Sequence, residues 1–265
     1  MNIRFIKMEA LGNDYVYVVE PDNQGLELNK LIRTVPKMCD RHFGIGSDGV
    51  IVVGLENGSV WARIYNPDGS EAESCGNGLR CVAKIAFDKN MTAGKKDISI
   101  TLKKTGRKVH AFLDAENTGT VTVDMGKVKV SDLEELNKIE FIPVDMGNPH
   151  AVIFMKNIET LDIESVGPAI EKNKRFPDRT NVEFVEVVSK KEIKLRVWER
   201  GVGETLACGT GACAAVAAAF YSGLCDNNVL VNMPGGKAEV SMDEQKSMHL
   251  TGPVNYVFKG EYLIP

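Results

Sequence analysis

The sequence predicts an α/β (α+β) fold made of two similar halves, each a sheet with two helices. One pentapeptide pattern occurs twice, as Ser74-Cys75-Gly76-Asn77-Gly78 and Ala207-Cys208-Gly209-Thr210-Gly211, and each copy leads into an alanine- and valine-containing stretch that can form a helix. Gly12-Asn13 and Gly147-Asn148 precede the two cysteines by almost the same distance. The 265 residues, 43% of them hydrophobic, can bury the cores of two domains of ordinary size. Together these observations favour a duplicated structural repeat.

An alignment of the two halves without gaps supports the duplication. It places Glu71 opposite Glu204 and Asp48 opposite Asn181. Chance can match common residues such as glycine and alanine, but it does not readily put a Cys-Gly-x-Gly at corresponding depth in both halves. The polar, turn-forming residues 114–119 are the predicted boundary between the halves.

Strand-like segments, in which apolar and polar residues alternate or β-branched residues gather, recur in both halves. In the first half they are residues 15–19, 50–53, 60–65, 98–102, 109–113 and 121–123. In the second half they are residues 151–154, 182–188, 193–198, 229–231, 238–241 and 256–263. Most are predicted to be antiparallel strands. Helices are predicted at residues 28–38, 78–90, 163–173 and 210–222, with Gly94 and Gly223 near the ends of two of them.

Charge and hydropathy argue against several classes of protein. A net charge of -4 and a pI near 5.7 do not suit a nucleic-acid-binding protein, so the basic residues 103–108 are predicted to be a solvated hairpin turn. Residues 1–15 lack the pattern of a secretory signal, and the apolar residues 212–221 are fewer than the roughly 20 that span a membrane. We therefore expect a cytoplasmic protein with no membrane or nucleic-acid partner.

The six cysteines are expected to be reduced thiols, because nothing in the sequence indicates secretion. The spacings of the closest cysteine pairs differ from those of structural zinc sites, so no metal is expected. Free cysteine is often buried. Burial is the expectation for the four cysteines outside the repeated pattern, namely Cys39, Cys81, Cys213 and Cys225.

The repeated pattern itself suggests chemistry at Cys75 and Cys208. A cysteine just before a helix lies near backbone N–H groups that lack intrahelical partners, a setting that favours the thiolate. The following glycines let an anionic group approach the backbone closely. If both helices point into one cleft, each thiol faces one side of the carbon beside a bound carboxylate. One thiolate could then remove a proton while the other thiol returns one, which inverts the stereocentre.

Neighbouring polar residues add to this hypothesis, although each also has a structural explanation. His150 and Glu199 could adjust the protonation of the thiols, but a lone histidine is more often structural and the pair Glu199-Arg200 more often a surface ion pair. Asn13 and Asn181 are equally suited to capping turns. Cys75 and Cys208 could be inert packing residues, but the duplicated glycine context favours function.

The motifs closely resemble the diaminopimelate epimerase family over nearly the whole chain. The family comprises enzymes of lysine and cell-wall precursor synthesis that work without pyridoxal phosphate or metal. Beyond the two pentapeptides, the motifs that carry the resemblance are Leu11-Gly12-Asn13-Asp14-Tyr15, Arg41-His42-Phe43-Gly44-Ile45-Gly46, Asn66-Pro67-Asp68-Gly69-Ser70, Gly147-Asn148-Pro149-His150 and the stretch from Glu199 to Leu206.

The resemblance implies two pseudo-symmetric domains, each an antiparallel β-barrel-like sheet around a central helix, with the active site between them. The first would be residues 1–116, joined by C-terminal strands at 254–265, and the second residues 117–253. It also implies a homodimer, no cofactor, and conversion of LL-2,6-diaminopimelate to the meso isomer.

The same resemblance implies roles for individual residues. Cys75 and Cys208 match the acid and base, and Gly76-Asn77 and Gly209-Thr210 match the backbone cradle for the reacting carboxylate. His150 and Glu199 correspond to residues thought to adjust the protonation of the cysteines. The residues that match substrate contacts are Asn13, Asn66, Asn148, Asn181, Glu199 and Arg200, and the planar guanidinium of Arg200 suits a distal carboxylate.

Two positions depart from the family pattern. Glu9-Ala10 stands where many members have His or Gln followed by Gly, and Gly49 stands where many have a glutamine that contacts substrate. We assign no side-chain role at Gly49. Both departures bear on the substrate more than on the type of reaction.

Other functions remain open. A cofactor-independent racemase of another amino acid, such as histidine, would share both cysteines, whereas the related proline racemase and phenazine-synthesis groups fit the flanking motifs less well. A two-lobed amino-acid-binding or thiol-redox sensing protein is the alternative from a different class.

Overall fold

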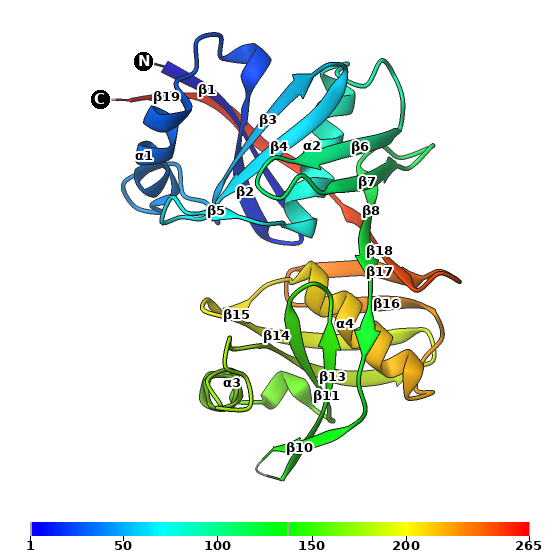
Figure 1. The fold of residues 1–265 in the computed structure, drawn as a ribbon. Coiled ribbons are helices and arrows are strands. Elements are labelled where there is room, and N and C mark those ends of the chain that lie inside the picture. Colours follow the sequence, from blue (N-terminus) through cyan, green and yellow to red (C-terminus); the bar gives the residue numbers. More distant parts are fainter. Residues whose placement is uncertain (1, 137, 265) are drawn as a thin grey trace. The chain divides into compact units, whose positions relative to one another are not determined.

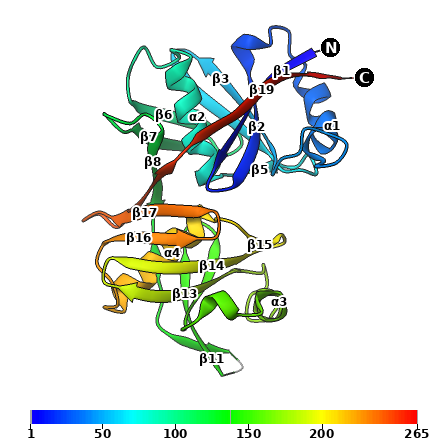
Figure 2. The same cartoon turned by 180° about the vertical axis from the view of Figure 1, so that it is seen from behind.

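The computed structural model describes residues 2–136 and 138–264, which belong to two compact units (Figure 1). Unit 1 comprises residues 1–123 and 253–265, and unit 2 comprises residues 124–252. The last strand, β19 (Asn255–Leu263), pairs antiparallel with the first, β1 (Asn2–Ala10), so the two ends of the chain meet in unit 1 (Figure 2).

Unit 1 is a mixed sheet with two helices. The strands lie in the order β19-β1-β2-β3-β4-β6-β7-β8, and the short β5 pairs with the end of β4. The helices are α1 (Leu28–Cys39) and α2 (Gly76–Asp88), and η1 (Glu20–Asp22) is a 3-10 turn. The remaining strands are β2 (Asn13–Val19), β3 (Val50–Glu56), β4 (Ser59–Tyr65), β5 (Glu71–Ala72), β6 (Asp97–Leu102), β7 (Lys108–Leu113) and β8 (Thr120–Lys127).

Unit 2 repeats this plan. The strands lie in the order β9-β11-β12-β13-β14-β16-β17-β18, with β10 on β11 and β15 on the end of β14. The helices are α3 (Ile163–Glu171) and α4 (Gly209–Tyr221), and η2 (Ile158–Thr160) is a 3-10 turn. The strands are β9 (Lys129–Val130), β10 (Glu134–Leu136), β11 (Ile139–Asp145), β12 (Pro149–Phe154), β13 (Asn181–Ser189), β14 (Glu192–Glu199), β15 (Gly203–Thr205), β16 (Asn228–Met233), β17 (Gly236–Met242) and β18 (Ser247–Pro253).

The two units share a common series of strands and helices, which confirms the predicted repeat. Strands β1 to β8 correspond to β11 to β18, and in each unit one helix follows the second strand while the other follows the fifth. The parallel pairs also correspond, because β2–β3 and β4–β6 in unit 1 match β12–β13 and β14–β16 in unit 2. Most strand pairs in each sheet are antiparallel, as predicted, and two pairs in each unit are parallel.

One helix lies at the centre of each unit. Helix α2 contacts β1, β2, β3, β6 and β7, and α4 contacts strands from β9 to β17, so each sheet curves around its helix. Nearly every residue of α4 is buried, and most of them are alanines. Small side chains let the surrounding strands approach the helix closely, which explains a helix without a polar face.

The other helix of each unit covers the outer side of the sheet. Leu31, Val35 and Met38 of α1 recur at helical spacing and pack on β2 and β3 residues such as Val18 and Val52. Helix α3 buries Ile163 and Ile170 in the corresponding cluster of unit 2.

All four predicted helices are confirmed. The predicted first residues of α2 and α4 lie within two residues of the observed ones. Three strands of seven or more residues, β1, β11 and β18, were missed. In β1 the buried residues include Lys7, whose charge interrupts the apolar pattern. Lys7 pairs with Asp14 at 2.5 Å, and this ion pair makes its burial possible.

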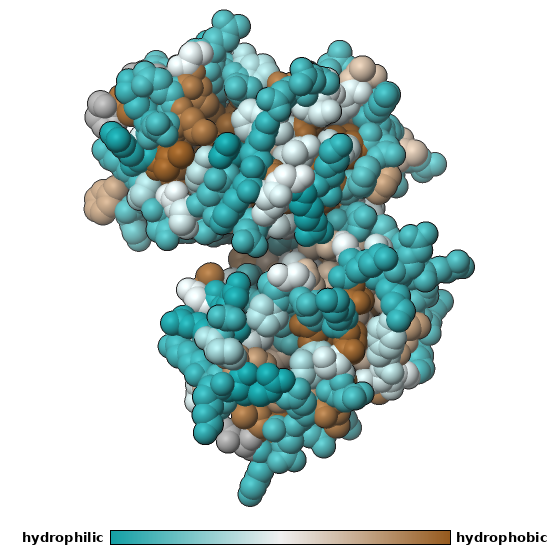
Figure 3. All heavy atoms as spheres, viewed as in Figure 1, coloured by the Kyte–Doolittle hydropathy of each residue, from teal (hydrophilic) through white to brown (hydrophobic). Residues whose placement is uncertain are grey.

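The surface shown in Figure 3 is mainly hydrophilic, with separate hydrophobic patches on each unit. Within residues 2–136 and 138–264, no helix is long and apolar enough to cross a membrane.

Candidate active site

Cys75 caps the N-terminus of α2. Its backbone is extended, and its Sγ accepts a hydrogen bond from Gly78 N at 3.4 Å. A Cβ at Gly78 would lie 2.6 Å from Ile51 Cδ1, so glycine lets the first turn of the helix pack against β3. Gly76 and the buried Asn77 begin this turn, and the backbone N–H groups in the first turn of a helix can bind a carboxylate.

Asn13, at the start of β2, faces the sulfur of Cys75. The thiol donates to Asn13 Oδ1 at 3.5 Å, while Asn13 Nδ2 donates to Asp48 Oδ2 at 2.8 Å. Because the amide group of Asn13 is bonded on both sides, its oxygen is held toward the sulfur. The structure therefore brings two predicted site residues together and adds Asp48, to which the sequence analysis gave no role.

Charged side chains fix Asp48 in turn. Arg41 Nη2 lies 2.7 Å from Asp48 Oδ1 and 2.7 Å from Asp14 Oδ1. Burial acts to raise the pKa of Asp14, but hydrogen bonds from Arg41 and Lys7 outweigh it and the pKa is lowered. Burial raises the pKa of Asp48, and the neighbouring Asp14 adds to that rise. Asn13 is thus supported by an ionic network formed by residues of β1, β2 and the loop between α1 and β3.

Asn66 and Glu9 have local roles in this structure. Asn66 follows β4 and closes a turn, with its Nδ2 donating to Ser70 Oγ at 3.0 Å. Glu9 Oε2 accepts from Gly12 N at 2.9 Å, and its Oε1 accepts from Asn255 Nδ2.

Gly49 leaves no room for a side chain. A Cβ there would lie 2.3 Å from Tyr65 O and 2.6 Å from Tyr15 Cε1. The glutamine common at this position in the family could not be accommodated without a shift of these neighbours.

Cys208 caps α4 in the same way as Cys75 caps α2. Its Sγ accepts from Gly211 N at 3.4 Å and lies 3.5 Å from Thr210 Oγ1. Gly209 and Thr210 begin the helix, as Gly76 and Asn77 do in unit 1. The two units therefore carry equivalent cysteine sites.

The environment of Cys208 opposes its ionisation. Burial raises the pKa of the thiol well above its ordinary value, and the carboxylates of Glu199 and Glu183 raise it further. The hydrogen bond from the backbone N–H of Gly211 lowers the pKa of Cys208, as expected at a helix end, but desolvation and the two negative charges outweigh it. Burial likewise raises the pKa of Glu199, whose Oε1 accepts from Thr205 Oγ1 at 2.6 Å.

The start of β12 and the start of β13 bring three predicted site residues together. His150 and Asn181 are register partners in the parallel pair, and His150 Nε2 lies 3.1 Å from Asn148 Oδ1. Asn181 uses both ends of its amide, since Nδ2 donates to Pro149 O at 2.9 Å and Oδ1 accepts from Arg200 N at 3.0 Å. Asn181 thereby orders the loop that carries Arg200.

The guanidinium of Arg200 lies at the surface of unit 2. Its Nη1 donates to Asp178 O at 3.2 Å. An exposed arginine anchored at one nitrogen keeps further donors for a carboxylate ligand.

Glu183 is the buried residue of this region that sequence reasoning missed. Its Oε1 lies 2.7 Å from His150 Nδ1, with both side chains fully buried. The sequence signal for this residue was an acidic side chain between the apolar Val182 and Phe184. Both of these neighbours are buried in β13.

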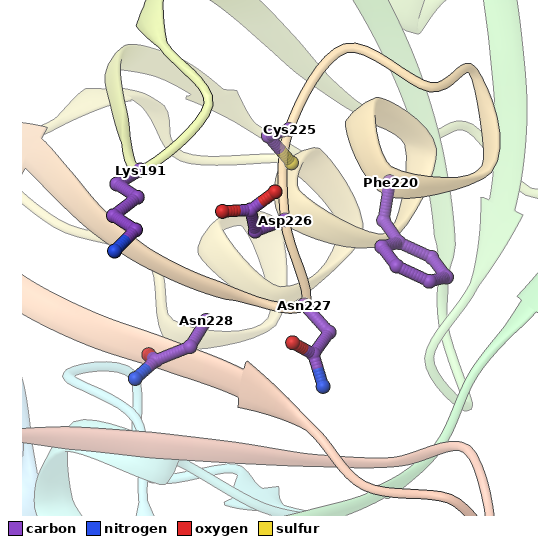
Figure 4. A pocket seen from close by; sticks show the side chains of 6 residues that line it. All are labelled: Lys191, Phe220, Cys225, Asp226, Asn227 and Asn228. Carbon is purple, nitrogen blue, oxygen red and sulfur yellow. The ribbon is translucent and has the colours of Figure 1, made fainter.

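A surface pocket of unit 2 lies apart from these residues. It is lined by Lys191, Phe220, Cys225, Asp226, Asn227 and Asn228 (Figure 4). Burial raises the pKa of Cys225 to about 11, and its sulfur donates to Val216 O, so this thiol is unreactive. Among the described residues, no group of three or more His, Cys, Asp or Glu side chains is arranged to hold a metal ion.

Relatives match the chain over nearly its whole length. The sequence matches the family described as diaminopimelate epimerase over residues 5–131 and 142–257. It is 40% identical to the diaminopimelate epimerase of Desulforapulum autotrophicum, with 100% of both chains covered. It is 39% identical to those of Desulfitobacterium hafniense, covering 98% of each chain, and Methanococcus maripaludis, covering 98% of this chain and 99% of the relative.

Solved structures with low sequence identity share the fold. A Bacillus anthracis phenazine biosynthesis protein of the PhzF family superposes with a TM-score of 0.78 at 16% identity, covering 100% of both chains. A hydroxyproline epimerase from Agrobacterium vitis superposes with a TM-score of 0.70 at 14% identity, covering 98% of this chain and 92% of its own. With full-length identity near 40% and matching helix-capping cysteines, the chain belongs to the diaminopimelate epimerase family.

Proposed function

We propose that the protein converts LL-2,6-diaminopimelate to the meso isomer by acid–base catalysis with two cysteines, in the synthesis of lysine and peptidoglycan precursors. The observation that carries the proposal is the pair of cysteines, each capping the central helix of its own repeat, in a member of this family. The reaction needs no redox change and no group transfer, only movement of one proton at the α-carbon.

The two thiols divide the proton transfer. Cys75, as thiolate, takes the α-proton, and the C–H electrons pass into the adjacent carboxylate. The thiol of Cys208 then gives a proton to the opposite face of the carbon and becomes a thiolate. Burial favours the thiol form of Cys208 and supports its assignment as the acid in this direction.

The backbone cradles stabilise the charge that develops on the substrate. Gly76-Asn77 and Gly209-Thr210 lie at the start of the two central helices. Their backbone N–H groups would bind the reacting carboxylate. The mechanism requires both cysteine sites to contact the same substrate molecule.

The remaining site residues would select the substrate. Arg200 would bind the distal carboxylate, and Glu199 would bind an ammonium group and influence Cys208. Asn13, Asn66, Asn148 and Asn181 would contact the polar ends of the substrate. His150 would adjust the protonation of Cys208 through the buried residues around it.

Deuterium exchange tests the proposal. Reduced protein is incubated in deuterated water with LL-diaminopimelate, and separately with histidine, and both stereochemistry and label at Cα are followed. Inversion and labelling of diaminopimelate alone supports the proposal. Labelling of histidine alone would replace the substrate but keep the two-thiol mechanism, and no labelling of either would favour a binding or redox protein.

We also propose that the functional domains are residues 1–116 with 254–265 and residues 117–253, and that the enzyme is a cytoplasmic homodimer. Exposed Tyr256, Val257 and Phe258 on β19 support self-association, because β19 pairs with β1 and carries apolar side chains at the surface. Light scattering on the purified protein measures the oligomeric state.

A further inference from the structure

Glu183 is a buried carboxylate to which neither the family motifs nor the proposed function gives a role. It lies in β13, and its exposed fraction is 0%. Oε1 lies 2.7 Å from His150 Nδ1, whereas Oε2 has no hydrogen-bond partner among the described residues. A buried carboxylate oxygen without a partner costs stability. Packing alone therefore gives no reason for an acidic residue here.

The carboxylate lies directly against the first turn of α4. A Cβ at Gly211 would lie 2.9 Å from Glu183 Oε1 and 3.3 Å from Cys208 Sγ. Gly211 N also donates to that sulfur at 3.4 Å. Glu183 and Cys208 thus flank the same glycine, and the missing side chain is what allows the carboxylate to come so close.

Four titratable groups from four elements influence one another in this region. They are His150 of β12, Glu183 of β13, Glu199 of β14 and Cys208 at the start of α4. Ionised carboxylates oppose formation of a thiolate, and a protonated histidine favours it. The carboxyl groups of Glu183 and Glu199 outnumber the single imidazole of His150, so the buried charges together favour the thiol form of Cys208.

We propose that Glu183 is a positioning residue for Cys208. Its carboxylate orients the ring of His150 through Nδ1 and places negative charge beside the first turn of α4, which keeps Cys208 in the thiol form. The inference rests on the proposed function, in which Cys208 delivers a proton to the substrate. After delivery, the same charge favours return of Cys208 to the thiol.

Glu183→Gln tests this role because it keeps the shape of the side chain and removes its charge. The rate at which iodoacetamide alkylates Cys208 is measured against pH by peptide mass spectrometry, without substrate. We expect the midpoint to move to lower pH by on the order of one unit, since one nearby charge shifts a pKa by about that much. Glu186→Gln is the matched control, because Glu186 lies on the same strand, is partly buried and accepts from Ile158 N at 3.2 Å.

The outcomes separate a charge effect from a structural one. An unchanged or higher midpoint in folded Glu183→Gln protein overturns the inference, as does an equal shift in Glu186→Gln. If Glu183→Gln does not fold, Glu183→Asp is the second variant. It keeps the charge but moves it away from Cys208 by the length of one methylene, so we expect a smaller shift of the midpoint to lower pH. No shift in Glu183→Asp then overturns the inference.

The alkylation result is independent of the proposed function. Failure of the wild-type protein to label diaminopimelate would end the epimerase proposal without changing the alkylation midpoint. If the wild-type protein epimerises diaminopimelate normally but the midpoint in Glu183→Gln is unshifted, the proposed role of Glu183 is wrong and the epimerase proposal stands. In an active Glu183→Gln variant, the limb of the kcat/KM profile that reports the Cys208 thiol also moves to lower pH.

Discussion

Asp48→Ala would remove the acceptor that holds Asn13 toward Cys75. Asp48 Oδ2 accepts from Asn13 Nδ2 at 2.8 Å and from Asp14 N at 2.9 Å, and Oδ1 pairs with Arg41 at 2.7 Å. Alanine cannot replace any of these contacts. Asn13 then loses one of the two bonds that orient its amide.

The structure sets the size of the expected effect. A hydrogen bond to a charged group contributes about 1.5–3 kcal/mol, whereas an exposed ion pair contributes about 0–1 kcal/mol. Asn13 and Asp14 are only partly buried, so water compensates for part of the loss. We expect the free energy of unfolding to fall by about 2–4 kcal/mol. Misplacement of Asn13 should lower kcat/KM by roughly 10- to 100-fold.

Urea denaturation and initial-rate kinetics measure the two effects. Asp68→Ala is the control, because Asp68 also accepts one backbone N–H and one side-chain donor, from Ser70 N at 2.8 Å and Ser70 Oγ at 2.6 Å, but in an exposed turn. Its loss should lower the free energy of unfolding less than the loss of Asp48 does, because Asp68 lies at the surface. Equal stability changes in the two variants, or wild-type kcat/KM in Asp48→Ala, would refute the reasoning.

Three further predictions concern the thiols. Cys75→Ala and Cys208→Ala should each abolish inversion, because one thiol cannot serve both faces of the α-carbon; wild-type turnover in either variant would end the two-base mechanism. Mild oxidation should abolish activity and a reductant restore it, and full activity in protein shown by mass spectrometry to contain a Cys75–Cys208 disulfide would contradict this. Burial raises the pKa of Cys81 from 9.0 to about 12, so this thiol loses its proton at lower pH in the unfolded chain than in the folded one. The free energy of unfolding should therefore fall as the pH rises from 9 toward 12, by about 1.4 kcal/mol per pH unit. Urea melts at pH 8 to 10.5 measure this slope, and a slope that is the same in Cys81→Ala would exclude Cys81 as its source.

The duplicated fold could be predicted from the sequence because its signals are local. The Cys-Gly-x-Gly pattern marks the start of α2 and of α4, and alternation of apolar residues marks strands such as β6 and β7. The parallel pairs β2–β3 and β12–β13 could not be predicted, since pairing depends on where distant segments meet. Strand β1 was missed because a buried lysine disguises its pattern.

The sequence identifies the candidate reactive groups, because Cys75 and Cys208 stand in motifs. It does not identify Asp48 and Glu183, because only the fold brings them beside Asn13 and Gly211. Which of the two thiols is ionised could not be predicted from the sequence. The sequence shows the helix end near the sulfur, but burial and the carboxylates of Glu199 and Glu183 arise from three-dimensional packing.

The two cysteines to which we assign the proton transfer also cap the central helices. A negatively charged sulfur accepts a backbone N–H more strongly than a neutral one, so each thiolate stabilises the first turn of its own helix. In the proposed reaction Cys75 loses its negative charge and Cys208 gains one. Each turnover therefore weakens the hydrogen bond that caps the N-terminus of α2 and strengthens the one that caps α4, and the reverse reaction does the opposite.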